Sequence, residues 1–150
     1  MGADTAASHL IFFIVSVIIA LSVAGGIFMN VQSISTAATI GSRAMSEQLK
    51  TDITVINDPD TIPYDSSAGV YIFYVKNTGK EELSPVGITV LIDGVTITDG
   101  NINKTVIQGG TVWRATDVLK VNATVTLGTG SHKIRVVTGN GIDDEFEFRR

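Results

Sequence analysis

Carboxylates and histidines are the residues in this chain whose chemistry could support a metal site or acid–base catalysis. Three aspartates lie within residues 58–65, and residues 143–147 contain four acids in five positions. Such oxygen ligands suit Ca²⁺, but neither cluster has the spacing of an EF-hand loop. The two histidines, His9 and His132, have no second ligand nearby in the sequence. We therefore expect a solvated acidic edge and solvated or interfacial histidines, with no bound metal.

Other catalytic patterns are missing from the sequence. The chain has no cysteine, which excludes a disulfide scaffold, a thiol nucleophile and a Cys-ligated metal. It contains no G-x-S-x-G elbow, no phosphate loop and no H-E-x-x-H motif. A membrane-tethered enzyme or ligand-binding domain would need a concave site with convergent polar groups, and the sequence supplies none. The net charge of −4 also argues against nucleic-acid binding. We expect a non-enzymatic protein without a cofactor.

Two short sequences match the acceptor pattern for N-glycosylation, N-x-[ST]. They begin at Asn103, which is followed by Thr105, and at Asn122, which is followed by Thr124. Matches of this length arise by chance in a threonine-rich region. Both are nonetheless compatible with a domain that lies outside the cell, where such glycans occur.

The charges divide the chain into two parts. Of 26 charged side chains, 11 basic and 15 acidic, only Asp4 precedes Arg43. An apolar rod is therefore followed by a polar block rich in glycine, threonine and valine. We expect two domains: residues 1–50 form a transmembrane and stalk helix, and residues 51–150 form a β domain.

Residues 10–29, LIFFIVSVIIALSVAGGIFM, are apolar apart from two serines. A helix of 20 residues is about 30 Å long, the thickness of a bilayer's hydrocarbon core. Thirteen of these residues are Leu, Ile, Val or Phe, which together favour insertion by about 4 to 8 kcal/mol. A cleaved signal peptide would need a basic start and a shorter apolar run. The pattern predicts a retained membrane-spanning helix, continuous over residues 5–49.

This helix carries a stripe that could pack against other helices. Apolar and small residues step by four and three from Ile27 to Gln48, which resembles a heptad. Small residues in the membrane part form rows that let helix backbones approach closely, one of them made by Ser22 with Gly26. An amphipathic stalk lying against its own domain is the alternative to a seam with identical helices. The residues predicted to mediate self-association are Ser16, Ala20, Ala24, Gly25, Ile27, Val31, Ile34 and Ala38.

From residue 52 the hydrophobic period changes to two, and β-branched residues dominate. Frequent turn signals between short strands predict a two-sheet sandwich, immunoglobulin-like in architecture. Residues 70–75 are apolar on both faces, which predicts either a central strand or a strand with one face covered by another subunit. Asp93-Gly94 predicts a hairpin turn. Residues 58–65 are expected to form a loop. The predicted strands are residues 53–57, 70–77, 87–93, 95–98, 105–107, 112–116, 118–127, 133–138 and 144–149.

The order of these elements resembles the archaeal flagellin-like superfamily of archaellins and type IV pilin-like proteins. Three stretches carry a closer resemblance: ASHLIFFIVSVIIALSVAGGIF, SEQLKTDITVINDPDTIP, and VYIFYVKNTGKEELSP followed by ITVLIDG. They are similar to the FlaF/FlaG family of archaellum accessory proteins. The resemblance covers nearly the whole chain and implies a pilin-like helix that leads into the sandwich.

The resemblance implies a structural role in swimming. Members of this family are membrane-anchored, with the sandwich between the cell membrane and the surface (S-) layer, and act as the static part of the archaellum motor. It also implies that the chain self-assembles and is joined through FlaF to the S-layer. Archaellins carry Lys or Arg before a Gly at the cleavage site, whereas Gly2 here follows Met1 directly, so we expect no such processing. A filament subunit, archaellin or pilin, remains the alternative.

Charge alone orients the chain poorly. No Lys or Arg precedes the apolar run, and Arg43 and Lys50 are the first basic residues after it. The positive-inside rule then leans weakly toward a cytoplasmic sandwich. Both residues are far from the span, so we expect an extracellular β domain in spite of it.

Overall fold

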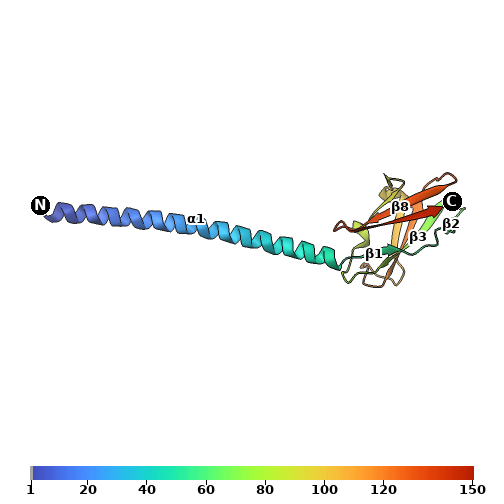
Figure 1. Cartoon of the computed structure of the whole chain (residues 1–150), viewed down its shortest axis with the longest axis horizontal. Coiled ribbons are helices and arrows are strands. Elements are labelled where there is room, and N and C mark those ends of the chain that lie inside the picture. Colours follow the sequence, from blue (N-terminus) through green and yellow to red (C-terminus); the bar gives the residue numbers. More distant parts are fainter. Residues whose placement is uncertain (1) are drawn as a thin grey trace. The chain divides into compact units, whose positions relative to one another are not determined.

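The structure is a computed structural model that describes residues 2–150, with side chains from residue 5 onward. The chain forms two compact units, one ending at Arg43 and the other comprising Ala44–Arg150. One helix, α1 (Gly2–Lys50), accounts for the first unit and contributes its last residues to the second. Figure 1 shows α1 as a continuous ribbon and the strands that follow it. The helix predicted over residues 5–49 is confirmed.

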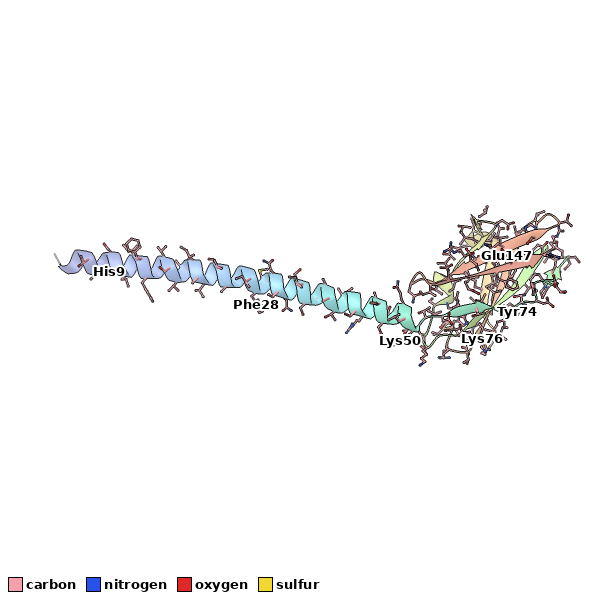
Figure 2. All side chains as sticks on the ribbon, in the orientation of Figure 1. His9, Phe28, Lys50, Tyr74, Lys76 and Glu147 are labelled. Atoms are coloured by element: carbon pink, nitrogen blue, oxygen red, sulfur yellow. The ribbon has the colours of Figure 1, made fainter. Side chains whose placement is uncertain are left out.

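The side chains of α1 are exposed on every side from Thr5 to Met45, and Figure 2 shows them projecting from the ribbon. They include large apolar groups such as Phe12 and Phe28, which are 72% and 69% exposed. In water this much apolar surface is unfavourable, by about 25 cal/mol for each Å². The helix therefore belongs in an apolar environment or against other helices.

The second unit contains two antiparallel sheets, which confirms the prediction of a helix followed by a β-sandwich. The first sheet has the order β1-β3-β7-β6, and β2 also pairs with β3. The second sheet has the order β5-β4-β8-β9. The immunoglobulin-like label stays a prediction. The strands of the first sheet are β1 (Ile53–Val55), β2 (Tyr64–Asp65), β3 (Val70–Asn77), β6 (Ile102–Val106) and β7 (Val118–Thr124); those of the second are β4 (Thr89–Ile92), β5 (Val95–Thr96), β8 (Ser131–Val137) and β9 (Asp143–Arg149).

Alternation along each strand builds the core between the two sheets. In β3 every second residue is buried, and the phenyl ring of Phe73 meets that of Phe148 from β9 edge-on at 5.2 Å. Trp113 is completely buried as well. β3 lies between β1 and β7, as its two apolar faces predict. The Asp93-Gly94 hairpin is also confirmed, with φ of +51° and +80°, the signs that a type I′ turn requires.

The predicted strand at residues 112–116 is wrong. Trp113 makes only an isolated bridge with Leu83, through two backbone hydrogen bonds of 2.8 and 2.9 Å. Its indole Nε1 donates to the carbonyl oxygen of Asp117, which closes a turn. Thr116 adopts a φ of +72°, so the backbone cannot continue as a strand. Trp113 is thus a core anchor held in a loop.

Other boundaries also differ from the predictions. The expected loop at residues 58–65 ends in strand β2, where the rings of Tyr64 and Tyr71 lie 4.6 Å apart. Strand β1 is shorter than predicted because Asn57 bonds β3 through its side chain, accepting from Tyr74 N and donating to Ile72 O. A short 3₁₀ turn, η1 (Pro85–Gly87), shortens the predicted strand 87–93 at its start. A second one, η2 (Asp99–Asn101), follows the predicted strand 95–98, which is also shorter, and β6 begins directly after η2.

Candidate interaction surfaces

One face of α1 gathers most of the residues predicted for self-association. A helix turns by about 100° per residue, so steps of three and four keep side chains on one line. Seven residues fall within about 40° of that line: Ser16, Ala20, Ala24, Ile27, Val31, Ile34 and Ala38. Gly25 does not belong to this line. It follows Ala20 by five residues, so its position lies about 140° around the helix axis from that of Ala20. Gly25 lies nearer to the face that carries Ser22 and Gly26.

The polar side chains of the apolar segment have their hydroxyls bonded within the helix. Ser16 Oγ donates to the carbonyl oxygen of Phe12 at 2.6 Å, and Ser22 Oγ donates to that of Ile18 at 2.8 Å. A hydroxyl that is already bonded costs less to bring into hydrocarbon. By length and composition, α1 is long and apolar enough to cross a membrane.

The end of α1 that belongs to the second unit is joined to the sandwich by a hydrogen-bond network. Thr51 is only 6% exposed, and its Oγ1 donates to the carbonyl oxygen of Glu47 at 2.7 Å. Asn140, in the turn between β8 and β9, donates from Nδ2 to the same Oγ1 at 2.6 Å. Gln48 Nε2 in turn donates to the carbonyl oxygen of Asn140 at 2.9 Å. Sequence reasoning missed this junction.

A tight backbone contact reinforces the junction. The carbonyl oxygen of Lys50 accepts hydrogen bonds from Lys80 N at 2.7 Å and Glu81 N at 3.3 Å. A Cβ added at Gly79 would lie 2.4 Å from that oxygen and 2.5 Å from Asp52 N, so only glycine fits. The Asn77-Thr-Gly79 turn was the one sequence signal that could have pointed to this close approach.

The charged side chains on the outward face of the first sheet are lysines, apart from Asp65 on the short strand β2. Among the described residues, the outward positions of β1, β3, β6 and β7 include no carboxylate. Lys76 and Lys120 lie there beside half-buried Ile72, Tyr74 and Val118, and Figure 2 labels Tyr74 and Lys76 on β3. Flat, partly apolar faces of this kind suit contact with another protein.

Asn103 and Asn122, the two predicted glycan acceptors, lie on this face and pair directly across β6 and β7. Asn103 is exposed, and its Oδ1 accepts a hydrogen bond from Thr105 Oγ1 at 3.0 Å. Asn122 is only half-exposed, and its Oδ1 is buried without a hydrogen-bond partner among the described residues. The sequence pattern gave the two asparagines equal standing, but their surroundings differ.

The outward face of the second sheet is a ladder of ion pairs. Arg135 Nε lies 2.8 Å from Asp143 Oδ2, and Lys133 Nζ lies 3.2 Å from Glu145 Oε2. These acidic partners raise the pKa of both basic side chains, chiefly through the hydrogen bonds. The acidic edge predicted at residues 143–147 is thus partly neutralised by β8. Exposed pairs of this kind stabilise little but discourage unwanted strand pairing.

His132 was expected to be solvated, but the structure shows a mostly covered side chain with two hydrogen-bond partners. It lies in β8 with its side chain 13% exposed, and both ring nitrogens have acceptors: Asp93 Oδ2 at 2.7 Å and the carbonyl oxygen of Gly128 at 3.0 Å. The hydrogen bond that His132 makes to Asp93, and then the one to the Gly128 carbonyl oxygen, raise the pKa of His132. The pKa of Asp93 is lowered by hydrogen bonds from Lys133 N and from His132.

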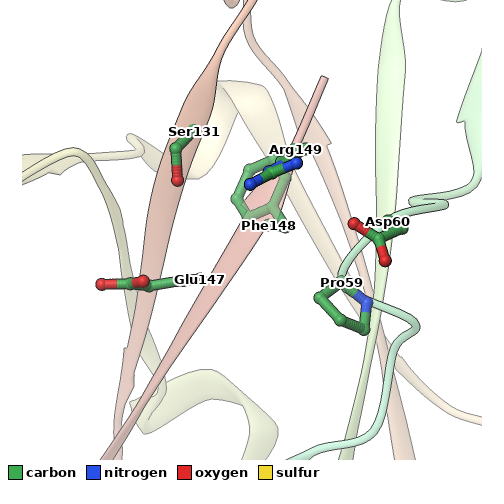
Figure 3. A pocket seen from close by; sticks show the side chains of 6 residues that line it. All are labelled: Pro59, Asp60, Ser131, Glu147, Phe148 and Arg149. Atoms are coloured by element: carbon green, nitrogen blue, oxygen red, sulfur yellow. The ribbon is translucent and has the colours of Figure 1, made fainter.

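Two of the three aspartates within residues 58–65, Asp58 and Asp65, accept hydrogen bonds from nearby backbone N–H groups. Asp58 Oδ1 accepts from Asp60 N, and Asp65 Oδ1 accepts from the backbone and hydroxyl of Ser67, which lower its pKa. A hollow of about 400 Å³ lies nearby. Figure 3 shows Ser131 and Glu147 on one side of it, Pro59 and Asp60 on the other. Among the described residues, no group of three metal-ligating side chains comes together.

Comparison with known proteins places the whole chain in one family. The model of the archaeal-type flagellin family matches residues 3–148. Flagella-related protein G of Methanocaldococcus jannaschii is 32% identical over 142 residues, which are 93% of this chain and 92% of that protein. The protein of the same name from Methanococcus voltae is 32% identical over 143 residues, 93% of each.

Two solved structures from Sulfolobus acidocaldarius resemble the chain more distantly. The archaellum periplasmic stator protein FlaG is 16% identical with a TM-score of 0.45, covering 65% of this chain and 99% of that one. A chain of the FlaF and FlaG stator complex is 16% identical with a TM-score of 0.44, covering 62% and 90%. By the match over residues 3–148 and its two relatives at 32% identity, the chain belongs to the archaeal-type flagellin family, a family of structural archaellum components and not of enzymes.

Proposed function

We propose that the chain is a membrane-anchored stationary component, a stator, of the archaellum motor. The first unit crosses the cell membrane once. The second unit, Ala44–Arg150, called the β unit below, lies outside, between the membrane and the S-layer. A rotating filament delivers torque only when part of the motor is held still against the envelope. The chain supplies that fixed point and performs no chemistry. Membership of the archaeal-type flagellin family, with relatives named as flagella-related, supports this role.

The observation that carries the proposal is the exposed apolar surface of residues 10–29. The large apolar side chains there are 40–73% exposed. Burying them in hydrocarbon gains several kcal/mol, and a helix leaves no backbone group unpaired. The two serines add little cost because their hydroxyls are already bonded to backbone oxygens. A single span suffices to hold a small outward domain.

The β unit provides the surfaces for holding the envelope. Contacts made by Thr51, Asn140 and Gly79 hold residues 44–50 to the sandwich. Its two outward sheet faces differ in charge, so they can bind different partners. We propose the sister protein FlaF as one partner, and through it the S-layer.

Copies of the chain associate through α1. The line from Ser16 to Ala38 combines small residues and Ile27 in the apolar segment with Val31 and Ile34 beyond it. In lipid such rows favour close packing, and outside it the apolar side chains drive association. Several joined anchors resist torque better than one. The alternative, a stalk folded against its own domain, predicts a monomer.

Protease treatment of intact cells that lack their surface layer tests the placement of the β unit. The proposal predicts that the β unit is digested, while a membrane-embedded fragment containing residues 10–29 survives. A cytoplasmic protein in the same cells serves as the control for leakage. Survival of the β unit, with the control intact, would overturn the outward placement.

Filament subunit is the second candidate function, because the matching family is that of archaeal flagellins. Copy number and location separate the two roles. A stator is retained in the membrane at low copy number when filaments are sheared from cells, whereas a subunit is shed in thousands of copies. Cells lacking a stator would assemble filaments but not swim, and normal swimming would contradict the proposal.

A further inference from the structure

We infer that Asn103 is a site of N-glycosylation and that Asn122, which has the same sequence pattern, is not. The inference rests on the proposed placement of the β unit outside the cell, since N-glycans are added there. The side chain that is modified must reach a large membrane-bound transferase and then have room for a sugar. The two asparagines differ in both respects.

Asn103 lies on β6, the last strand of its sheet, so it has a neighbouring strand on one side only. Its side chain and that of Thr105 are both exposed on the same face. Between them, Lys104 points inward, where its Nζ donates to the carbonyl oxygen of Ile88 at 2.7 Å. This anchor fixes which face of β6 is outward, and it keeps Asn103 and Thr105 together in the open.

The side chains of the acceptor sequence are already in contact. Thr105 Oγ1 donates to Asn103 Oδ1 at 3.0 Å. This bond occupies the amide oxygen, and Asn103 Nδ2 has no hydrogen-bond partner among the described residues. Nδ2 is the atom that accepts the sugar. The hydroxyl at the third position of the pattern thus orients the asparagine.

Asn122 lies in a more crowded place. β7 is flanked by β3 and β6, so Asn122 has Ile72 opposite it on one side and Asn103 on the other. Its Oδ1 is buried without a partner among the described residues, so Thr124 does not bond it as Thr105 bonds Asn103. A transferase would have to pull out a central strand to reach it, which costs the ladder bonds on both sides.

The pairing also makes the two sites mutually exclusive. Residues directly opposite on antiparallel strands have Cα atoms about 4.5–5.5 Å apart. A sugar ring attached at Asn103 is wider than this spacing and covers Asn122. The chain therefore carries one glycan at most. That glycan also shields the edge of β6, whose backbone groups are otherwise free to pair with a foreign strand.

The donor is an oligosaccharide linked to a lipid phosphate. Asn103 Nδ2 forms a bond to the anomeric carbon of the first sugar, and the bond from that carbon to the phosphate oxygen breaks. The lipid phosphate leaves with the electron pair, and one proton leaves Nδ2. Nothing is oxidised or reduced, and no co-reactant other than the lipid-linked oligosaccharide is consumed.

Intact mass spectrometry of the full chain tests the site. The chain is expressed in an archaeal host that N-glycosylates its own surface proteins and is then purified from the membrane. Wild type is expected to carry one glycan, Asn103→Gln and Thr105→Ala none, and Thr105→Ser one. Asn122→Gln and Thr124→Ala are the matched controls and should keep the glycan. Unchanged Trp113 fluorescence checks that each variant is folded.

Each other outcome counts against the inference. A glycan retained by Asn103→Gln, lost by Asn122→Gln, or present twice in wild type would overturn the choice of site. An unmodified chain, with the host's surface proteins glycosylated, would overturn it as well. Protease treatment of the same cells separates the two proposals: a digested but unmodified β unit overturns only the glycan site, whereas a protected β unit overturns the outward placement too.

Discussion

Asn140 Nδ2 donates a hydrogen bond of 2.6 Å to Thr51 Oγ1, across 89 positions of the sequence. Thr51 is the first residue after α1, and Asn140 lies in the turn between β8 and β9. Asn140 is itself held by Thr138, whose Oγ1 donates to Asn140 Oδ1 at 2.6 Å. One hydroxyl and one carboxamide therefore join the end of the helix to the second sheet. The junction can be tested in several ways.

Thr51→Val should weaken the junction without changing its shape much. The substitution removes the hydrogen bonds to Glu47 and from Asn140, and it leaves Asn140 Nδ2 without its partner. We expect the free energy of unfolding of the β unit to fall by about 1–3 kcal/mol. Urea unfolding of the full chain in detergent measures it, because Trp113, the only tryptophan, is fully buried in this unit. The exposed Thr126→Val is the control, with a change within about 0.5 kcal/mol.

Gly79→Ala should lower the stability of the β unit more than the addition of one methyl group would suggest. The added Cβ would collide with two backbone atoms, Lys50 O and Asp52 N, which cannot rotate away as a side chain can. We expect a loss of about 2–3 kcal/mol in the same urea experiment. Gly100→Ala, where the added Cβ meets nothing within 4 Å, is the matched control. Equal stability of the two variants would mean that the contact at Lys50 is not maintained in solution.

His132 should make the stability of the β unit depend on pH. Its folded pKa is raised above the unfolded value of 6.5, mainly by the hydrogen bond to Asp93, although burial and then nearby Arg150 oppose the effect. The stabilisation is then fully present below pH 6.5 and is lost as pH rises through the folded pKa. In wild type, the free energy of unfolding should fall as the pH is raised from about 5 to about 9. His132→Gln should flatten the curve, and the exposed, uncharged substitution Thr126→Val should leave its slope unchanged.

Because of Asp93, we expect the free energy of unfolding to change with pH in the opposite direction at acid pH, falling as the pH is lowered. Its folded pKa is lowered from 3.8 by hydrogen bonds from Lys133 N and from His132. Its contribution is present above the unfolded pKa and disappears as pH falls through the folded one. Asp93→Asn should therefore reduce the acid loss of stability seen in wild type. If the acid limb were unchanged in Asp93→Asn, other carboxylates such as Asp65 would have to account for it.

Substitutions in α1 should alter self-association but not the β unit. Ala20→Phe places a large ring in the row of small residues, so we expect smaller oligomers in detergent by light scattering. Gly25→Leu tests the opposite side of the helix, since it lies about 140° from Ala20. A two-helix seam would be disrupted by Ala20→Phe alone, whereas a bundle would be disrupted by both. Ile19→Phe, about 100° from Ala20, is the control, and equal oligomer size in all variants would contradict the packing.

Local patterns determined much of the fold. The apolar run at residues 10–29 determined the helix, because only a helix satisfies its own backbone in apolar surroundings. The two apolar faces of residues 70–75 placed β3 in the middle of its sheet, and Asp93-Gly94 specified a type I′ turn. The predicted strand around Trp113 was wrong. That residue is held by a backbone bridge to Leu83 and by a hydrogen bond to the carbonyl oxygen of Asp117, which the alternation of residues 112–116 does not reveal.

The sequence by itself determined the two-part organisation, the alternation that fills the core, and the presence of two glycosylation patterns. Only the tertiary structure decided that Asn103 lies at an edge while Asn122 lies beside it in the centre of the same sheet. It also brought Thr51 to Asn140 and His132 to Asp93. The physical reason is that hydrophobic periodicity specifies which face of a strand is buried, whereas strand order and cross-strand register arise from packing between segments far apart in the chain.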